Sequence, residues 1–132
     1  MSITPYRNEI ESLFASGYQA ALATTGAGSQ AVQWLLSVGG ASTFVLDACV
    51  PYATKSLEDY MGFWPLKFVS VSTAQAMAAA AYTRAMAYRP EGAPTLGLGS
   101  TAAIATNYAK KGDHHVALAV HSAARLYTWQ LK

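Results

Sequence analysis

Charge is the scarcest property of this chain of 132 residues. Charged side chains make up 12% of the sequence, about half of average usage. The nine lysines and arginines outnumber the seven acidic residues only slightly, for a formal net charge of +2. They form no basic run, so we expect no nucleic-acid partner. Because 52% of the residues are hydrophobic, we expect apolar surface to be buried against another subunit, in a homo-oligomer or a larger assembly.

Cysteine and histidine are also rare. The single cysteine, Cys49, excludes an internal disulfide, and its apolar surroundings predict a small buried hydrophobe. Of the three histidines, His115 and His121 share a face of a predicted strand but lie roughly 20 Å apart, and His114 points the other way. We therefore predict no metal site, no cofactor and no Cys–His nucleophile.

Long hydrophobic runs are missing. No segment approaches the roughly 20 apolar residues of a membrane helix, since Gln75, Thr83 and Arg84 interrupt the alanine-rich stretch 74–87. The first six residues have neither the basic flank nor the apolar core of a signal peptide. We expect no membrane partner and a location in the cytoplasm or an organelle interior. The length and even composition predict one domain, residues 1–132.

Hydrophobic periodicity and turn residues predict an α/β domain whose central mixed sheet is flanked by helices in two or three layers. Thr4 is the predicted N-cap of a first helix that begins at Pro5 and ends near Gly17. The further elements expected are helices from Ser29 to Gly39 and over 53–60 and 72–88, buried strands over 20–24, 42–50 and 95–98, an antiparallel edge pair over 115–121 and 126–131, a loop over 89–94 and a turn over 110–113.

The turn from Thr24 to Ser29 is the first candidate binding site. Gly26 and Gly28 allow the main chain to approach a ligand closely, and the helix that follows offers free N–H groups and a partial positive charge to an anion. In open α/β sheets, ligands bind at such strand-to-helix turns. The spacing matches neither the dinucleotide fingerprint nor the phosphate loop, so an ordinary tight turn is the alternative.

Two further groups follow neighbouring strands. Tyr52 and Lys55 come after the second strand, where a lysine with a lowered pKa can deprotonate a hydroxyl nucleophile and the tyrosine can relay the proton. Ser100 and Thr101 add hydroxyl groups at the end of the third strand. The alternatives are a solvated lysine at a helix start and a polar strand end.

At these residues the sequence resembles the C-terminal domain of CinA-type proteins, the nicotinamide mononucleotide deamidases. The resemblance covers about residues 5 to 121 and consists of five degenerate motifs in the same order with nearly the same gaps. Residues 23–29 correspond to the family's run Ala-Glu-Ser-Cys-Thr-Gly-Gly, and residues 37–42 correspond to Asp-Val-Pro-Gly-Ser-Ser. Residues 50–57 correspond to Val-Thr-Tyr-Ser-Asn-Glu-Ala-Lys. The helix from Ser72 corresponds to Val-Ser-Glu-Glu-Val-Ala-x-Ala-Met-Ala, and residues 98–102 correspond to Ala-Val-Thr-Gly-Ile.

The resemblance implies a mechanism in which a serine, activated by a lysine and assisted by a tyrosine, cleaves a carboxamide and releases ammonia. Thr25 stands at the nucleophile position and Tyr52 is retained, but the lysine position holds Leu57. Lys55 would have to replace that lysine. The family's arginine-rich loop and closing helix also have no counterpart here, and a partner subunit is expected to supply both.

Three functions remain open at this point. The first is a divergent CinA-like pseudoenzyme that binds a pyridine or related nucleotide with reduced or absent amidohydrolase activity. The second is an active deamidase with Thr25 as nucleophile, Lys55 as base and Tyr52 positioning it, or another hydrolase on the same scaffold. The third is an assembly subunit without a ligand. The predicted ligand-binding residues are Thr24, Gly26, Gly28, Ser29, Ser100 and Thr101.

Overall fold

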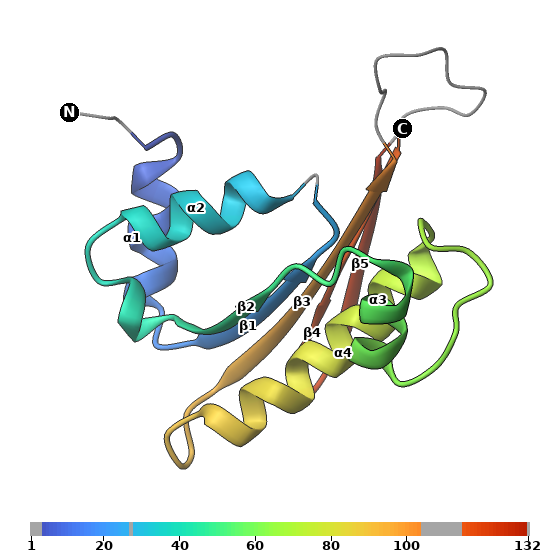
Figure 1. Cartoon of the computed structure of the whole chain (residues 1–132). Helices are drawn as coiled ribbons and strands as arrows, with labels where there is room; N and C mark the ends of the chain where they lie inside the picture. Colours follow the sequence, from blue (N-terminus) through green and yellow to red (C-terminus); the bar gives the residue numbers. More distant parts are fainter. Residues whose placement is uncertain (1–3, 27, 104–114, 132) are drawn as a thin grey trace.

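The computed structural model describes residues 4–26, 28–103 and 115–131. Within these ranges a five-stranded sheet has the order β2-β1-β3-β4-β5, with helices on both faces (Figure 1). The predicted α/β class with a mixed central sheet is confirmed. In chain order the elements are α1 (Arg7–Ala15), β1 (Gln19–Thr24), α2 (Ser29–Ser37), the 3₁₀ turn η1 (Ala41–Thr43), β2 (Val45–Cys49), α3 (Thr54–Met61), α4 (Val71–Tyr88), β3 (Thr95–Ala103), β4 (His115–His121) and β5 (Leu126–Leu131).

The central strand β1 is parallel to both of its neighbours. In the register, Ala23 of β1 lies beside Cys49 of β2 and Gly99 of β3, and Thr24 lies beside Ser100. The two remaining pairings, β3 with β4 and β4 with β5, are antiparallel. Because β1, β2 and β3 run in the same direction, their carboxyl ends meet at one edge of the sheet, where the candidate residues follow them.

One face of the sheet is covered by α1 and α2 (Figure 1). Alternate residues of β1, Ala20 and Leu22, point to this face, because successive side chains of a strand point to opposite sides. They pack with Ile10 of α1 and Leu35 of α2 in one apolar cluster, which Phe44 completes. This cluster holds α1 and α2 against the sheet.

The opposite face is covered by α3 and α4 (Figure 1). Small residues dominate this contact: Ala21 and Ala23 of β1 face α4, and Ala117 and Ala119 of β4 do the same. β3 contributes glycines, and a Cβ at Gly97 or Gly99 would overlap backbone atoms of α4. Since no side chain stands between them, the helix lies unusually close to the sheet.

Three predicted boundaries were wrong. The first helix begins at Arg7, after Tyr6, which has a left-handed φ of 59° and makes no side-chain cap, so Thr4 is not its N-cap. Residues 41–43 form a 3₁₀ turn, and only Val45–Cys49 pairs as the second strand. The third strand continues to Ala103 because its hydrogen-bonding edge is paired with β4 as far as His115.

Two sequence predictions, the turn over 110–113 and the orientation of His114, lie outside the described residues. The predicted edge pair over 115–121 and 126–131 is confirmed to the residue. In the described part of the chain, none of the helices combines the length and apolar character required to span a bilayer.

Candidate functional site

The turn between β1 and α2 is tied to β3 by its backbone. The amide of Thr25 donates a hydrogen bond to the carbonyl of Ser100 at 3.2 Å, and the amide of Ser29 donates to the carbonyl of Gly26 at 3.0 Å. Gly26 has a φ of +77°, in the left-handed region, which glycine occupies at little cost. The turn is therefore anchored at the carboxyl edge of the sheet, as the sequence predicts.

The hydroxyl of Thr25 is the first of two linked hydroxyls. It donates to the hydroxyl of Thr101 at 3.2 Å, and Thr101 donates in turn to the backbone carbonyl of Phe68 at 2.7 Å. Thr101 is buried. A carbonyl oxygen accepts a hydrogen bond but does not remove a proton at neutral pH. The chain of donors that starts at Thr25 therefore ends on a group that cannot act as its base.

Two further hydroxyls lie close to Gly28. A Cβ at Gly28 would overlap the Oγ1 atom of Thr24 and lie 3.5 Å from the Oγ atom of Ser100. Thr24 is 4% exposed, and its hydroxyl has no hydrogen-bond partner among the described residues. A buried hydroxyl without a partner costs about 1–3 kcal/mol, so a ligand atom that bonds to it would recover that free energy.

Tyr52 lies against the same turn. A Cβ on Gly26 would be 3.1 Å from the Cε1 atom of the Tyr52 ring, so the missing side chain of Gly26 makes room for the aromatic ring. The tyrosine is 79% exposed and is free to contact a ligand at the turn. The structure thus brings Thr25, Thr101 and Tyr52 to one end of the sheet, around Gly26.

Lys55 lies in a different environment. Its ammonium group pairs with Asp59 at 3.2 Å and with Glu58 at 3.7 Å on the outer side of α3. The hydrogen bond to Asp59 is the main reason that the pKa of Lys55 is raised above its ordinary value. A lysine that acts as a general base needs a lowered pKa. The environment of Lys55 therefore shifts its pKa in the direction opposite to the one that the deamidase hypothesis requires.

Leu57 takes the inward position on α3. It is 2% exposed and packs with Ala23 of β1 and Met77 of α4. Ala23 and Thr25 lie two residues apart along the chain, so Leu57 is buried below the end of β1 that leads to the turn. The residue that corresponds to the family's lysine therefore faces the sheet, and here that residue is apolar.

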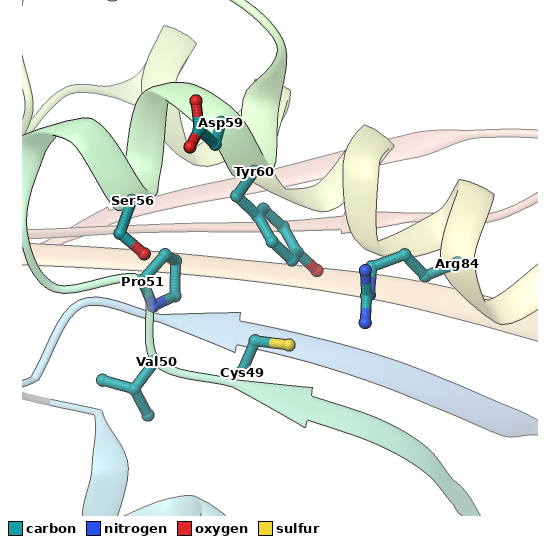
Figure 2. Close-up of a pocket in the computed structure, with 7 residues that line it drawn as sticks. All are labelled: Cys49, Val50, Pro51, Ser56, Asp59, Tyr60 and Arg84. Carbon is teal, nitrogen blue, oxygen red and sulfur yellow. The ribbon is translucent and has the colours of Figure 1, made fainter.

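A depression lies between the end of β2 and helices α3 and α4 (Figure 2). Its cavity volume is about 420 Å³. Figure 2 shows the hydroxyl of Tyr60 pointing toward the guanidinium of Arg84, whose Cζ atom lies 5.7 Å from the centroid of the Tyr60 ring. The lining residues are Cys49, Val50, Pro51, Ser56, Asp59, Tyr60 and Arg84.

An ion pair that the sequence analysis missed organises this depression. The Nε atom of Arg84 donates to Asp47 at 2.8 Å, and this hydrogen bond holds the pKa of Asp47 below its ordinary value. The thiol of Cys49 donates to the same carboxylate at 3.3 Å. Burial raises the pKa of the Cys49 thiol. Asp47 and Cys49 lie two residues apart in a strand and therefore share a face, and this spacing was the signal in the sequence that could have revealed their contact.

The ion pair predicts a pH dependence of stability. Asp47→Asn should lower the free energy of unfolding near neutral pH by up to about 1 kcal/mol, because the Arg84 side chain is 39% exposed and solvent screens the pair. The native pKa of Asp47 is depressed, so its contribution is complete above its unfolded pKa and is lost as the pH falls through the native value.

Urea denaturation of wild type and Asp47→Asn from neutral pH down to about pH 2 tests this, with the difference expected to shrink as the pH falls below about 4 and to be smallest at the low end of this range. Arg84→Met is the control. The double variant should lose less free energy of unfolding than the sum of the losses of the two single variants, because each single substitution already breaks the ion pair. A difference that stays constant at low pH contradicts the prediction.

Metal ligands do not gather in the described ranges, where no group of three or more His, Cys, Asp and Glu side chains is arranged to hold a metal ion. The chemistry of the turn is that of hydroxyls, backbone amides and an aromatic ring. These are groups that bind an anionic or polar ligand.

No protein-family model matches the sequence, and no curated protein matches it. Solved structures do match. A CinA superfamily protein from Escherichia coli is 16% identical, with a TM-score of 0.74 over 99% of this chain and 80% of the other. A competence/damage-inducible protein from Agrobacterium tumefaciens is 19% identical, with a TM-score of 0.76 over 98% and 83%. One from Enterobacter asburiae is 15% identical, with a TM-score of 0.75 over 99% and 84%.

These likenesses extend over almost the whole of this chain. At such low identity they establish the fold, and the chain has the α/β fold of CinA superfamily proteins in a divergent sequence. The resemblance that the sequence motifs predicted is confirmed at the level of the fold.

Proposed function

We propose that this CinA-like chain binds a phosphate-bearing mononucleotide, of the pyridine or a related class, at the turn between β1 and α2, with little or no amidohydrolase activity. The proposal is carried by the buried hydroxyl of Thr24, which has no partner among the described residues and lies against Gly28 at the start of α2.

Three features of the turn favour an anionic group. The first turn of α2 contains no acidic residue, so nothing opposes the partial positive charge at the helix start. Gly28, as the N-cap, leaves the backbone accessible. The hydroxyls of Thr24 and Ser100 both lie close to Gly28 and are donors for phosphate oxygens. The exposed ring of Tyr52 lies against Gly26 of the same turn and offers a surface for a heteroaromatic ring.

Two observations support weak or absent hydrolysis. A threonine attacks a carboxamide only when a base accepts its proton, and the proton of Thr25 is donated through Thr101 to a backbone carbonyl. The nearest lysine in the motif, Lys55, is paired with two carboxylates and keeps a raised pKa. The amide chemistry of the family thus lacks its proton acceptor among the residues that the structure describes.

Calorimetry with nicotinamide mononucleotide and with nicotinamide riboside tests the binding proposal. The riboside lacks the phosphate, so we expect it to bind at least about tenfold more weakly, because charge-assisted hydrogen bonds contribute about 1.5–3 kcal/mol each. Ser100→Ala should weaken binding of the mononucleotide several-fold, and Gly28→Ala should abolish it because the added methyl group would overlap the hydroxyl of Thr24 and displace it. Gly39→Ala is the matched control, since its Cβ would have no atom within 4 Å.

Equal affinity for the two compounds, or no binding of either by a folded protein, contradicts the proposal. The same protein preparation also tests the second candidate function, an active deamidase. This function is favoured by the placement of Thr25 and Tyr52 at the same turn. Ammonia release from nicotinamide mononucleotide that disappears in Thr25→Ala would establish that activity. We expect wild type and Thr25→Ala to release the same background amount.

A further inference from the structure

The face of β4 and β5 on the side of α1 and α2 carries a continuous row of apolar side chains. Cross-strand partners share a face, and the register pairs Val116 with Leu131, Leu118 with Trp129, and Val120 with Tyr127. The neighbouring β4 residues Ala117 and Ala119 point the other way, into the contact with α4. We refer to these six residues, Val116, Leu118, Val120, Tyr127, Trp129 and Leu131, as the β4–β5 face.

The helices of the described part of the chain leave this face largely open. β4 and β5 make their main helical contacts with α4, on the opposite side of the sheet, and the cluster under α1 and α2 is centred on β1. Tyr127 is 45%, Trp129 48% and Leu131 66% exposed. The rings of Tyr127 and Trp129 stack at a centroid distance of 6.2 Å, so they form one continuous aromatic patch.

The open face also contains a hollow. Val116, Leu118, Trp129 and Leu131, together with Ser100 of β3, line a cavity of about 260 Å³. Four of these five residues are apolar, so the cavity suits an apolar side chain better than water. The face therefore presents both an aromatic patch and a recess that Trp129 helps to line.

The edge strand is unprotected as well. All six residues of β5 are exposed, and Leu126–Leu131 contains no charged residue and no proline. Natural edge strands are usually blunted by lysine, proline or a bulge. A strand without these features at the rim of an apolar face is typical of a surface that is covered in the assembled protein.

We propose that the β4–β5 face binds the same face of a second copy of this chain, across a two-fold axis. Its charge favours this occupant: none of the six side chains is charged, so two copies can meet without burying an unpaired charge. An acidic or basic partner would find nothing complementary on it. In such an isologous contact the protruding Trp129 of each copy can enter the recess of the other.

The exposed area of the β4–β5 face is of the order that a stable dimer interface needs. With about 150–250 Å² on each aromatic side chain, the exposed parts of Tyr127, Trp129 and Leu131 present roughly 300–400 Å². That is close to half of the about 800 Å² per partner of a stable interface. The other half would come from the half-buried β4 residues, the backbone of β5 and the flank of the α1–α2 layer. Two sheets packed in this way lie about 10 Å apart.

Sedimentation velocity of the full chain from about 1 to 100 µM tests the proposal. We expect wild type to be a dimer at the upper end of this range, and Trp129→Lys to weaken the dimer at least tenfold. Gln130→Lys is the matched control: it adds the same charge to the same strand, but Gln130 pairs with Ala117 on the opposite face, so the dimer should persist.

Leu131→Lys is a second variant on the same face, for use if Trp129→Lys fails to fold, and circular dichroism checks the fold of each protein. A wild type that stays monomeric at about 100 µM overturns the proposal. So does a dimer that survives both lysine substitutions on the face, because the contact then lies elsewhere, for instance along the edge of β5. Calorimetry measures nucleotide binding at the turn separately, so failure of this proposal and failure of the proposed function are distinguishable.

Discussion

Gly99→Ala is expected to lower the free energy of unfolding by about 3 kcal/mol or more. A Cβ at this position would overlap the carbonyl oxygen of Ala74 and lie 2.5 Å from the amide nitrogen of Ala78, both backbone atoms of α4. A side chain could rotate away from the new methyl group, but a helix backbone cannot. The substitution therefore forces α4 off β3, and with it the contact that covers the middle of the sheet. Urea denaturation followed by tryptophan fluorescence measures the effect.

Gly39→Ala is the control for the glycine-to-alanine change itself. Its Cβ would meet no atom within 4 Å, and its φ lies outside the left-handed region. We expect a change of less than about 1 kcal/mol, with a small stabilisation possible because alanine restricts the unfolded chain. If Gly99→Ala were as stable as Gly39→Ala, the close packing of α4 on β3 would be wrong.

Met77→Ala should cost about 2–5 kcal/mol. Met77 is fully buried and fills the space between Ala23 of β1 and Leu57 of α3. Its neighbours on the sheet are small and cannot extend into the cavity, so it could be filled only by a shift of the larger side chains on the other side, Leu57, Tyr60, Met61 and Phe68. The loss combines the transfer free energy of the removed atoms with the free energy of an unfilled cavity. Thermal and urea unfolding both measure it.

Met86→Ala is the matched control on the same helix. Met86 is 39% exposed, so its truncation removes less buried surface, and we expect a loss below about 1 kcal/mol. Equal losses for the two variants would contradict the placement of Met77 at the centre of the α3–α4 core. A loss at Met77 also tests the site indirectly, because Leu57 and Ala23 pack on it below the turn.

The elements of the fold were predictable because each has a local signature. The apolar run before Thr24 and the glycines after it mark a buried strand and its turn, and β1 and α2 begin within one residue of the expected positions. The errors lie where a distant segment decides the outcome. Gly99 to Thr101 read as a polar strand end, yet β3 continues to Ala103 because β4 pairs with it.

The candidate site was predictable in part. The resemblance placed Thr25, Tyr52 and the lysine position in sequence, and the structure places Thr25 and Tyr52 at one turn. Spacing along the chain did not reveal that Thr25 donates to Thr101, which lies 76 residues away, or that Arg84 binds Asp47 across 37 residues. Side-chain contacts between such distant segments depend on how the helices pack on the sheet.

The sequence alone determined the α/β class, the order of the elements, the antiparallel edge pair and the glycine turn, since periodicity and turn residues act over a few neighbouring positions. Only the tertiary structure decided that Leu57 faces inward while Lys55 pairs with carboxylates on the outer side of α3. It also decided that the hydroxyl of Thr25 donates through Thr101 to a backbone carbonyl, and that the described helices leave the β4–β5 face largely open. These are properties of packing, and packing depends on the distances between elements rather than on the residues within any one of them.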